Sequence, residues 1–224
     1  MPRTAEPTRK RILDAAYRLF RRRGYSRVTM DEIAASAKLT KRTLYHHFES
    51  KDRLLADVLE AQHDLGLQAF RTFGAKLSGS PEAIVAGMFQ ELAVWADRPR
   101  WAGSGFTRLV IELADLPGHP ARTIARRHKA QLEDCLADLL TESGVDRAKD
   151  LARAMWLLSE GAISLILVHG DRGYSAAASH AAKMLVQQYA REHKSDGRSP
   201  RQLQGKPGGP GGRTSAPRPA DAKR

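Results

Sequence analysis

Apolar residues recur along most of this chain at spacings of three and four positions, the pattern of helices that bury one face. An early stripe at the i, i+3, i+4, i+7 and i+8 positions consists of Ile12, Ala15, Ala16, Leu19 and Phe20. Stretches in which β-branched and polar residues alternate, as they do in half-buried strands, are hard to find. The pattern therefore predicts an all-α protein.

Residues that can cap a helix, and Gly and Pro residues that can end one, divide this pattern into about nine helices. The predicted helices begin near Thr8, Thr29, Thr40, Ser50, Pro81, Ala102, Ala121, Asp146 and Ser175, and the last runs through Tyr189. The helix after Ser50 reaches about Phe73. It is long enough to link an N-terminal module mechanically to the rest of the chain.

The net charge of +12 is unevenly distributed along the 224 residues. Residues 1–53 hold 14 basic and 6 acidic side chains, the middle of the chain is nearly neutral, and residues 191–224 are basic again. Such a distribution indicates a polyanion-binding module joined to a body with another task. A composition that is merely rich in arginine would give a similar net charge, so the charge alone does not decide.

The remaining composition points to a cytoplasmic protein. A single cysteine, Cys135, excludes an internal disulfide framework and fits a reducing compartment. We expect no membrane span, since no apolar run approaches the roughly 20 residues required, and no secretory signal at the N-terminus. From residue 194 to residue 224 the chain is rich in Pro, Gly, Ser and Arg, which predicts a disordered basic tail.

Residues 29–51 predict two short helices joined by a tight turn. Thr29 can cap the first, and Thr40 can cap a second that is dense in hydrogen-bond donors. Leu44 and Phe48, four residues apart, give the second helix an inward edge. This is the layout of a helix-turn-helix, whose second helix lies in the major groove of DNA. A solvated pair of basic helices is the alternative.

The donor-rich helix has side chains suited to reading DNA. Lys41 and Arg42 stand at its start and can read guanine O6 and N7, while Thr43 can place its methyl on thymine. Tyr45, His46 and His47 offer donors to the phosphate walls. Helix N-termini, where Thr29 and Lys51 stand, favour phosphate.

Two stretches of the chain resemble the TetR/AcrR family of bacterial transcriptional regulators: TRKRILDAAYRLFRRRGY at residues 8–25 and TMDEIAASAKLTKRTLYHHFESKDRLL at residues 29–55. The most specific match is Thr43-Leu44-Tyr45 followed by His47-Phe48 and Lys51. The resemblance implies a DNA-binding domain over residues 6–66, with its motif at 29–48, and a regulatory and dimerisation domain over 67–193. It also implies a dimer that binds double-stranded DNA at an inverted-repeat operator, usually represses, and is released by a small molecule.

Carried over by position, the DNA contacts of the family fall on Thr29, Thr40, Lys41, Arg42, Thr43, Tyr45, His46, His47 and Lys51. Two positions depart from the family pattern. Lys38 occupies the turn position usually taken by Gly, so a positive φ there would cost of order 1 kcal/mol. Arg42 stands where a small residue is common, which implies a different operator from those of close relatives.

Two further sites are expected in the body. The family pairs its last two helices across the dimer, and small and apolar stripes there predict an interface of Met155, Leu158, Ala162, Leu165, Ile166, Ala178, Ala181 and Leu185. Packing within one protomer is the alternative. Bulky apolar residues with a few polar groups predict a pocket for an unknown effector, formed by Met88, Trp95, Trp101, Phe106, Arg108, His128, Trp156 and Glu160.

Catalytic motifs are absent from the sequence: there is no G-x-S-x-G elbow, phosphate-binding loop or H-E-x-x-H. The histidines show no metal-ligand spacing, so we expect neither a metal nor another cofactor. The competing hypothesis is a helical small-molecule-binding protein or enzyme with an incidental basic N-terminal end. The concentration of donors on one short helix favours the DNA-binding regulator.

Overall fold

The computed structural model describes residues 5–77 and 79–196, and this part of the chain folds into helices without a strand. The predicted all-α fold is confirmed. The helices are α1 (Ala5–Arg23), α2 (Met30–Ser36), α3 (Lys41–His47), α4 (Lys51–Gly74), α5 (Pro81–Ala96), α6 (Gly105–Glu112), α7 (Pro120–Glu142), α8 (Ala148–His169) and α9 (Gly173–Asp196).

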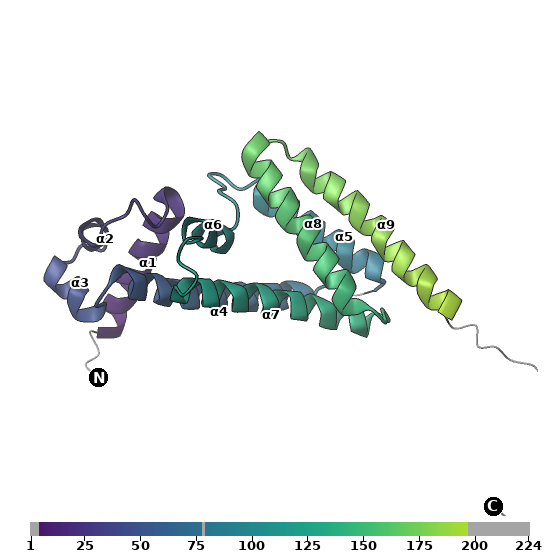
Figure 1. Cartoon of the computed structure of the whole chain (residues 1–224), viewed down its shortest axis with the longest axis horizontal. Coiled ribbons are helices and arrows are strands. Elements are labelled where there is room, and N and C mark those ends of the chain that lie inside the picture. Colours follow the sequence, from purple (N-terminus) through teal and green to yellow (C-terminus); the bar gives the residue numbers. More distant parts are fainter. Residues whose placement is uncertain (1–4, 78, 197–224) are drawn as a thin grey trace, which may run out of the picture.

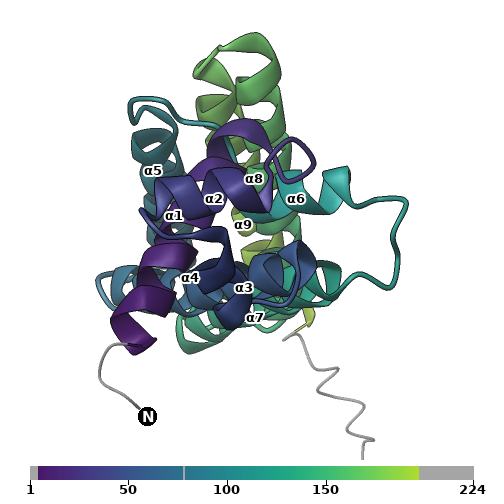
Figure 2. The same cartoon turned by 90° about the vertical axis from the view of Figure 1, so that its left-hand side faces the viewer.

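The first three helices pack with the start of α4 at one end of an elongated molecule (Figures 1 and 2). Their apolar stripes meet in a core whose most deeply buried side chains include Ile12, Ile33, Leu44, Phe48 and Leu55. Burial of such side chains supplies most of the stability of helices as short as α2 and α3.

A second core lies where α5, α7, α8 and α9 pack against one another. Its fully buried side chains include Phe89, Leu136, Leu140, Leu151 and Met155. The two cores are joined by α4 and α7, which run side by side along the long axis (Figure 1). The prediction that α4 links the two parts therefore agrees with its position.

Helix α6 and the start of α7 contribute to the N-terminal core, although they come late in the chain. Leu109, Leu113, Ala121 and Ile124 pack into the same cluster as α1 and α2. The N-terminal module is therefore in direct apolar contact with the part of the body that carries α6.

Helix α8 is the one helix in the described residues that is long and apolar enough to cross a membrane by length and composition. No such segment was expected from the sequence. The feature is weak support for a membrane span, because a core helix passes the same test, and α8 packs against α5, α7 and α9.

Several predicted helix starts were wrong. Thr8 lies inside α1, which begins three residues earlier, and Ser175 is buried in the first turn of α9. Asp146 does not cap α8, since Arg147 holds the N-cap position there without a side-chain capping bond. Residues 194–196, predicted to belong to a disordered tail, form the end of α9, and residues 197–224 of that tail lie outside the described residues.

Candidate functional site

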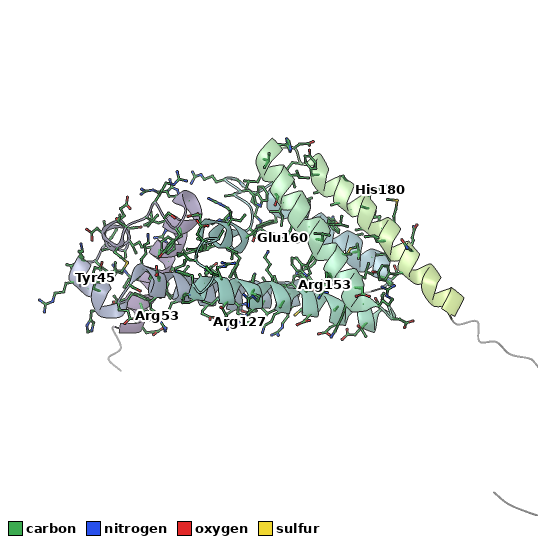
Figure 3. The ribbon with its side chains drawn as sticks, viewed as in Figure 1. Tyr45, Arg53, Arg127, Arg153, Glu160 and His180 are labelled. Carbon is green, nitrogen blue, oxygen red and sulfur yellow. The ribbon has the colours of Figure 1, made fainter. Side chains whose placement is uncertain are left out.

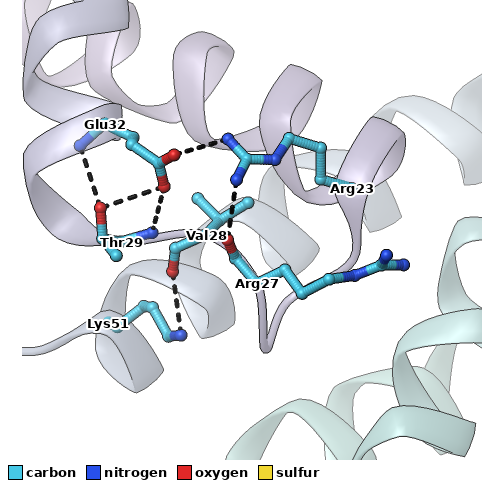
Figure 4. A network of polar contacts seen from close by, with 6 residues as sticks. All are labelled: Arg23, Arg27, Val28, Thr29, Glu32 and Lys51. Atoms are coloured by element: carbon cyan, nitrogen blue, oxygen red, sulfur yellow. Dashed lines mark hydrogen bonds and ion pairs between the residues drawn. The ribbon is translucent and has the colours of Figure 1, made fainter.

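Helix α2 begins with a reciprocal capping box (Figure 4). The Glu32 backbone N–H donates to Thr29 Oγ1 at 3.2 Å, and the Thr29 backbone N–H donates to Glu32 Oε2 at 2.8 Å. Arg23 holds the other carboxylate oxygen at 2.6 Å. The Thr29 N–H and the Arg23 guanidinium lower the pKa of Glu32 to about 2, so the carboxylate stays charged and ties α2 to the end of α1.

The turn between α2 and α3 ends α2 with a left-handed residue. The Leu39 N–H donates to the Ala34 carbonyl at 2.9 Å and the Lys38 N–H donates to the Ala35 carbonyl at 3.0 Å. These are the two hydrogen bonds of a Schellman motif, which places its extra residue at positive φ. Lys38 has φ 54°, so the cost expected from the sequence for a positive φ at this position applies.

Helix α3 presents one face to solvent and one to the core. Thr40 caps it by accepting from the Thr43 N–H at 3.1 Å, and Leu44 is buried beneath it. Arg42 and Tyr45 are exposed on the outward face. Figure 3 shows Tyr45 at the end of the molecule that carries α3. The helix is thus held rigidly with its donors pointing away from the body.

Lys51 faces the interior of the domain more than it faces solvent. Its ammonium donates to the carbonyls of Tyr25 and Val28, at 3.1 and 3.0 Å, and lies 4.2 Å from the centre of the Tyr25 ring. The Tyr25 hydroxyl donates to Asp52, and this bond lowers the pKa of the Asp52 carboxyl. Together these contacts join the loop before α2 to the N-terminus of α4.

The nine predicted DNA-contact residues fall into three groups. Four are exposed on α3: Lys41, Arg42, Tyr45 and His46. Thr40 is exposed just before α3, whereas Thr43 and His47 are half-buried at its edges. Thr29 and Lys51 use their side-chain donors within the domain itself: the exposed Thr29 hydroxyl donates to Glu32 at 3.0 Å, and the half-buried Lys51 ammonium donates to two carbonyls.

Two adjoining cavities lie in the body. The outer one has a volume of about 600 Å³ and is bounded by α6, α7 and α8; the inner one, of about 450 Å³, extends between α4, α5, α7 and α8. Their linings share Phe106, Lys129, Trp156 and Glu160. Volumes of this size accommodate a small organic molecule.

A polar network crosses the boundary between the two cavities. The Lys129 ammonium donates to Glu160 and, at 3.3 Å, to Ser104 Oγ. The Thr107 hydroxyl donates to the same Glu160 carboxylate at 2.8 Å. The network therefore holds α6, α7 and α8 together at the cavity wall.

A pair of buried histidines lies beside the inner cavity. His63 Nδ1 and His128 Nδ1 are 3.1 Å apart, and the His128 ring stacks on Phe106 at 3.9 Å between centroids. Burial, the Lys129 charge and His63 lower the pKa of His128 to about 4. The described residues contain no group of three side chains suited to hold a metal ion.

Six of the eight predicted pocket residues line the inner cavity: Met88, Trp95, Phe106, His128, Trp156 and Glu160. Trp101 does not line it and instead packs edge-on against Trp95 at 5.3 Å. Arg108 borders only a smaller space of about 120 Å³. Its guanidinium donates to the Arg21 carbonyl at 3.0 Å, so it serves to anchor α6.

Helix α6 is fixed to the N-terminal module by charged side chains one turn apart. Arg108 reaches the C-terminal end of α1, and Glu112 accepts from the Ser26 backbone N–H at 3.1 Å. Gly24, with φ 85°, lies so close to Glu112 that a Cβ there would clash with the carboxylate. The helix that walls the outer cavity therefore also touches the turn leading into α2.

The predicted dimer stripe points mainly into the protomer. Met155, Ala162, Ile166 and Ala178 are buried in the body core, and Leu158, Ala181 and Leu185 are half-buried. Of the predicted set, Leu165 is exposed. The outward faces of α8 and α9 instead carry Leu157, Gly161, Leu165, Val168, Ala177, His180 and Met184, which we call the α8–α9 face.

Three side chains important to the site were not predicted. Arg11 donates to the Ala37 carbonyl at the end of α2 at 2.7 Å, Glu112 holds the turn after α1, and Lys129 pairs with Glu160. Their partners are 26, 86 and 31 residues away along the chain. Spacing within one helix could not reveal such pairs.

Sequence comparison finds a similarity over α1, α2, α3 and the start of α4. A family model described as bacterial regulatory proteins of the tetR family matches residues 12–58. The HTH-type transcriptional regulator UidR of Escherichia coli (strain K12) is 38% identical over 71 residues, 32% of this chain and 36% of UidR. SrpR of Pseudomonas putida is 41% identical over 85 residues, 38% of this chain and 39% of SrpR. The chain thus matches little more than a third of the length of these curated relatives.

Structural similarity extends over the body as well. SCO4454, a TetR-family transcriptional regulator from Streptomyces coelicolor, superposes with a TM-score of 0.69 and 26% identity over 84% of this chain and 96% of that one. The reduced form of E. coli NemR superposes with a TM-score of 0.72 over 79% and 95% of the two chains; at 18% identity it supports the fold alone.

Proposed function

The chain belongs to the TetR family of bacterial regulatory proteins, and we propose that it is a sequence-specific DNA-binding repressor acting in the cytoplasm. The observation that carries the proposal is the outward face of α3. It collects Lys41, Arg42, Tyr45 and His46 at one end of the molecule, on a helix capped at Thr40 and seated on the core. A short helix with exposed donors, held by two others, is suited to enter a major groove.

The proposed roles on DNA differ between residues of this face. Arg42 is exposed and can donate two hydrogen bonds to one guanine edge. Tyr45 and His46 contact phosphate. The ammonium of Lys41 is held by Asp31 at 2.9 Å, so it must exchange this partner to reach DNA.

Titration of DNA binding by fluorescence anisotropy tests these roles. Arg42→Ala should cost about 1–3 kcal/mol on the preferred site and relax the preference at one base pair of each half-site. Tyr45→Ala should weaken binding to every sequence. Arg98→Ala, which removes a charge in the turn after α5, is the control and should bind as the parent does in the absence of an effector. A double variant, Arg42→Ala with Tyr45→Ala, that binds as tightly as the parent would refute the proposal.

We further propose that the protein acts as a homodimer through the α8–α9 face. Leu157 and Val168 are 75% and 73% exposed, which is unusual for large apolar side chains on a packed body. Gly161 has open space around its Cα and allows a second helix to approach closely. A two-fold dimer would place its two copies of α3 on successive major grooves of an inverted-repeat operator.

Release by a small-molecule effector is the remaining part of the proposal. Helix α6 contributes Phe106 and Thr107 to the lining of the outer cavity. The same helix is hydrogen-bonded to the end of α1 through Arg108 and to the following turn through Glu112. An effector that displaces α6 would therefore change the position of α1, and with it the distance between two copies of α3 in a dimer. We assign DNA binding to residues 6–66 and regulation with dimerisation to residues 67–193.

A further inference from the structure

The outer cavity has a surplus of positive charge. Its lining holds the basic side chains Arg122, Arg126, Lys129 and Arg153 and the acidic side chains Glu133 and Glu160. Glu160 is paired with Lys129, and Glu133 accepts from Arg153 at 3.1 Å. Both carboxylates are therefore neutralised by cations of the same lining, and two arginines are left over.

The two surplus arginines differ in their contacts. Arg122 donates to the Ala114 carbonyl at 3.0 Å, which uses one part of its guanidinium. Arg126 is exposed and makes no hydrogen bond or ion pair with another residue in the described part of the chain. A guanidinium can hold a carboxylate by two parallel hydrogen bonds, so Arg126 is prepared to receive an anion at the cavity mouth.

The inner cavity is suited to the apolar part of a ligand. Aromatic and aliphatic side chains dominate its lining, among them Phe70, Phe73, Met88, Leu92 and Phe106. His128 adds no charge near neutral pH, because its pKa lies at about 4. A ligand that enters this space gains by burial of apolar surface and by ring contacts.

Trp156 belongs to the lining of both cavities and has an unused donor. Its indole N–H is buried and has no acceptor among the described residues. A buried donor without a partner destabilises the protein, and an acceptor oxygen of a ligand would remove that cost. The Lys129 ammonium lies 5.8 Å from the same ring. Donors therefore outnumber acceptors where the two cavities meet.

We propose that the effector of this protein is a mainly apolar aromatic carboxylic acid, with its ring system against Phe106 and Trp156 and its carboxylate toward Arg126. The inference rests on the proposed function in taking these cavities as the effector site. The class of ligand follows from the lining itself: the inner cavity is mainly apolar, and the outer cavity that adjoins it carries the unpaired positive charge of Arg126.

Three probes that share one ring system and differ in charge test the chemical class. Calorimetry at pH 7.5 on the full chain compares 2-naphthoate, 2-naphthamide and 2-naphthylmethylammonium. We expect the anion to bind at least about tenfold more tightly than the neutral amide, since charge-assisted hydrogen bonds are about twice as strong as neutral ones, and the cation to bind least. Equal affinities for the anion and the amide, or no binding of the anion, would overturn the proposal.

Two adjacent arginines on α7 provide a matched pair of variants. Arg126→Gln should weaken the binding of naphthoate about five- to tenfold and leave the binding of naphthamide unchanged. This is the effect expected from the loss of one partly solvated ion pair of about 1 kcal/mol. Arg127→Gln removes the same charge, but that guanidinium pairs with Glu60 on α4 and does not belong to the cavity lining. An equal loss in both variants would show a general effect of charge and would contradict the assigned site.

The role of Trp156 has its own variant. Trp156→Phe keeps a ring in the wall and removes the N–H, so naphthoate affinity should fall while the melting temperature of the unliganded protein does not fall. An unchanged affinity would exclude the indole N–H as a donor to an oxygen of the ligand and would overturn the placement of the ligand against Trp156.

Failure of the ligand class and failure of the proposed function give different results. Naphthoate that binds with dependence on Arg126 but leaves DNA affinity unchanged supports the ligand class and refutes effector release. DNA binding that depends on Arg42 in a protein without affinity for naphthoate supports the regulator and refutes the ligand class.

Discussion

The His63–His128 pair predicts a specific sensitivity to acid. The two rings meet through Nδ1 atoms 3.1 Å apart, so one ring must donate and the other must accept with a neutral lone pair. His128 is 6% exposed, is stacked on Phe106, and has Lys129 as its neighbour in the chain. Protonation of His128 would place a buried positive charge beside the Lys129 ammonium and the His63 ring. We therefore expect the fold to resist protonation of His128 until the pH is well below neutral.

The sign and size of the effect follow from the two pKa values. The pKa of His128 is lowered from 6.5 to about 4 in the folded protein, so between these values the unfolded chain binds a proton that the folded chain does not. Stability is then fully present above pH 6.5 and is lost as the pH falls toward 4. Complete loss corresponds to about 3 kcal/mol, and we halve this for screening by nearby solvent. Between pH 7.5 and 5.0 the contribution of His128 is then about 1 kcal/mol.

Urea unfolding at pH 7.5 and 5.0, at one fixed protein concentration, measures this contribution. The difference in unfolding free energy between the two pH values should be about 1 kcal/mol smaller in His128→Gln than in the parent. His46→Gln, which removes an exposed histidine on α3, should keep the parental difference in the absence of DNA. The same pH dependence in His128→Gln and the parent, or an NMR titration of the His128 ring near 6.5 in the folded protein, would refute the reasoning.

Three further changes test other parts of the structure. Lys38→Gly should raise the free energy of unfolding by about 1 kcal/mol, because glycine adopts φ 54° without the clash of a Cβ; an unchanged or lower urea midpoint would contradict the strain. Leu165→Glu should convert the dimer to a monomer in light scattering, whereas Leu116→Glu, at an exposed apolar position in the loop before α7, should not; a dimer in both variants would remove the α8–α9 face from consideration. Tyr25→Phe should raise the pKa of Asp52 toward its ordinary value, because it removes the hydroxyl that stabilises the carboxylate. An Asp52 titration in NMR spectra that is the same in both proteins would exclude this hydrogen bond.

The sequence predicted local structure well where one short-range feature decides it. Thr29 with Glu32, and Thr40 with the Thr43 N–H, cap their helices as the spacing indicates. In each case the two hydrogen-bonding residues lie within a few positions of one another, so a short stretch of sequence is enough to predict the bond.

The outward faces of the last helices could not be predicted from periodicity. Helix α8 has apolar residues on both its buried and its exposed side. From the sequence alone, the stripe through Met155 and Ile166, which is buried, is as suitable for a dimer interface as the stripe through Leu157 and Val168, which is exposed. The strongest apolar stripe faces the protomer core because burial there removes more surface from water. Only the packing of α5, α7 and α9 distinguishes the two sides.

Long-range polar contacts limited the prediction of the site. Lys51 was expected on phosphate because it follows a helix cap, but carbonyls more than 20 residues earlier in the chain hold its ammonium. Arg108 was expected in the pocket because its helix is otherwise apolar, and it reaches the end of α1 instead. In both cases the basic side chain stabilises a junction between helices that only the folded chain brings together.

Selection of bound fragments from the native genome tests the central claim most directly, since that claim is two copies of α3 on one operator. The parent protein should enrich an inverted repeat whose half-sites are separated by one turn of DNA, about 34–36 Å, or a multiple of it. Arg42→Ala should lose enrichment at one symmetric pair of base positions. Enrichment of DNA without a repeat, or the same sequence preference in Arg42→Ala as in the parent, would contradict the account.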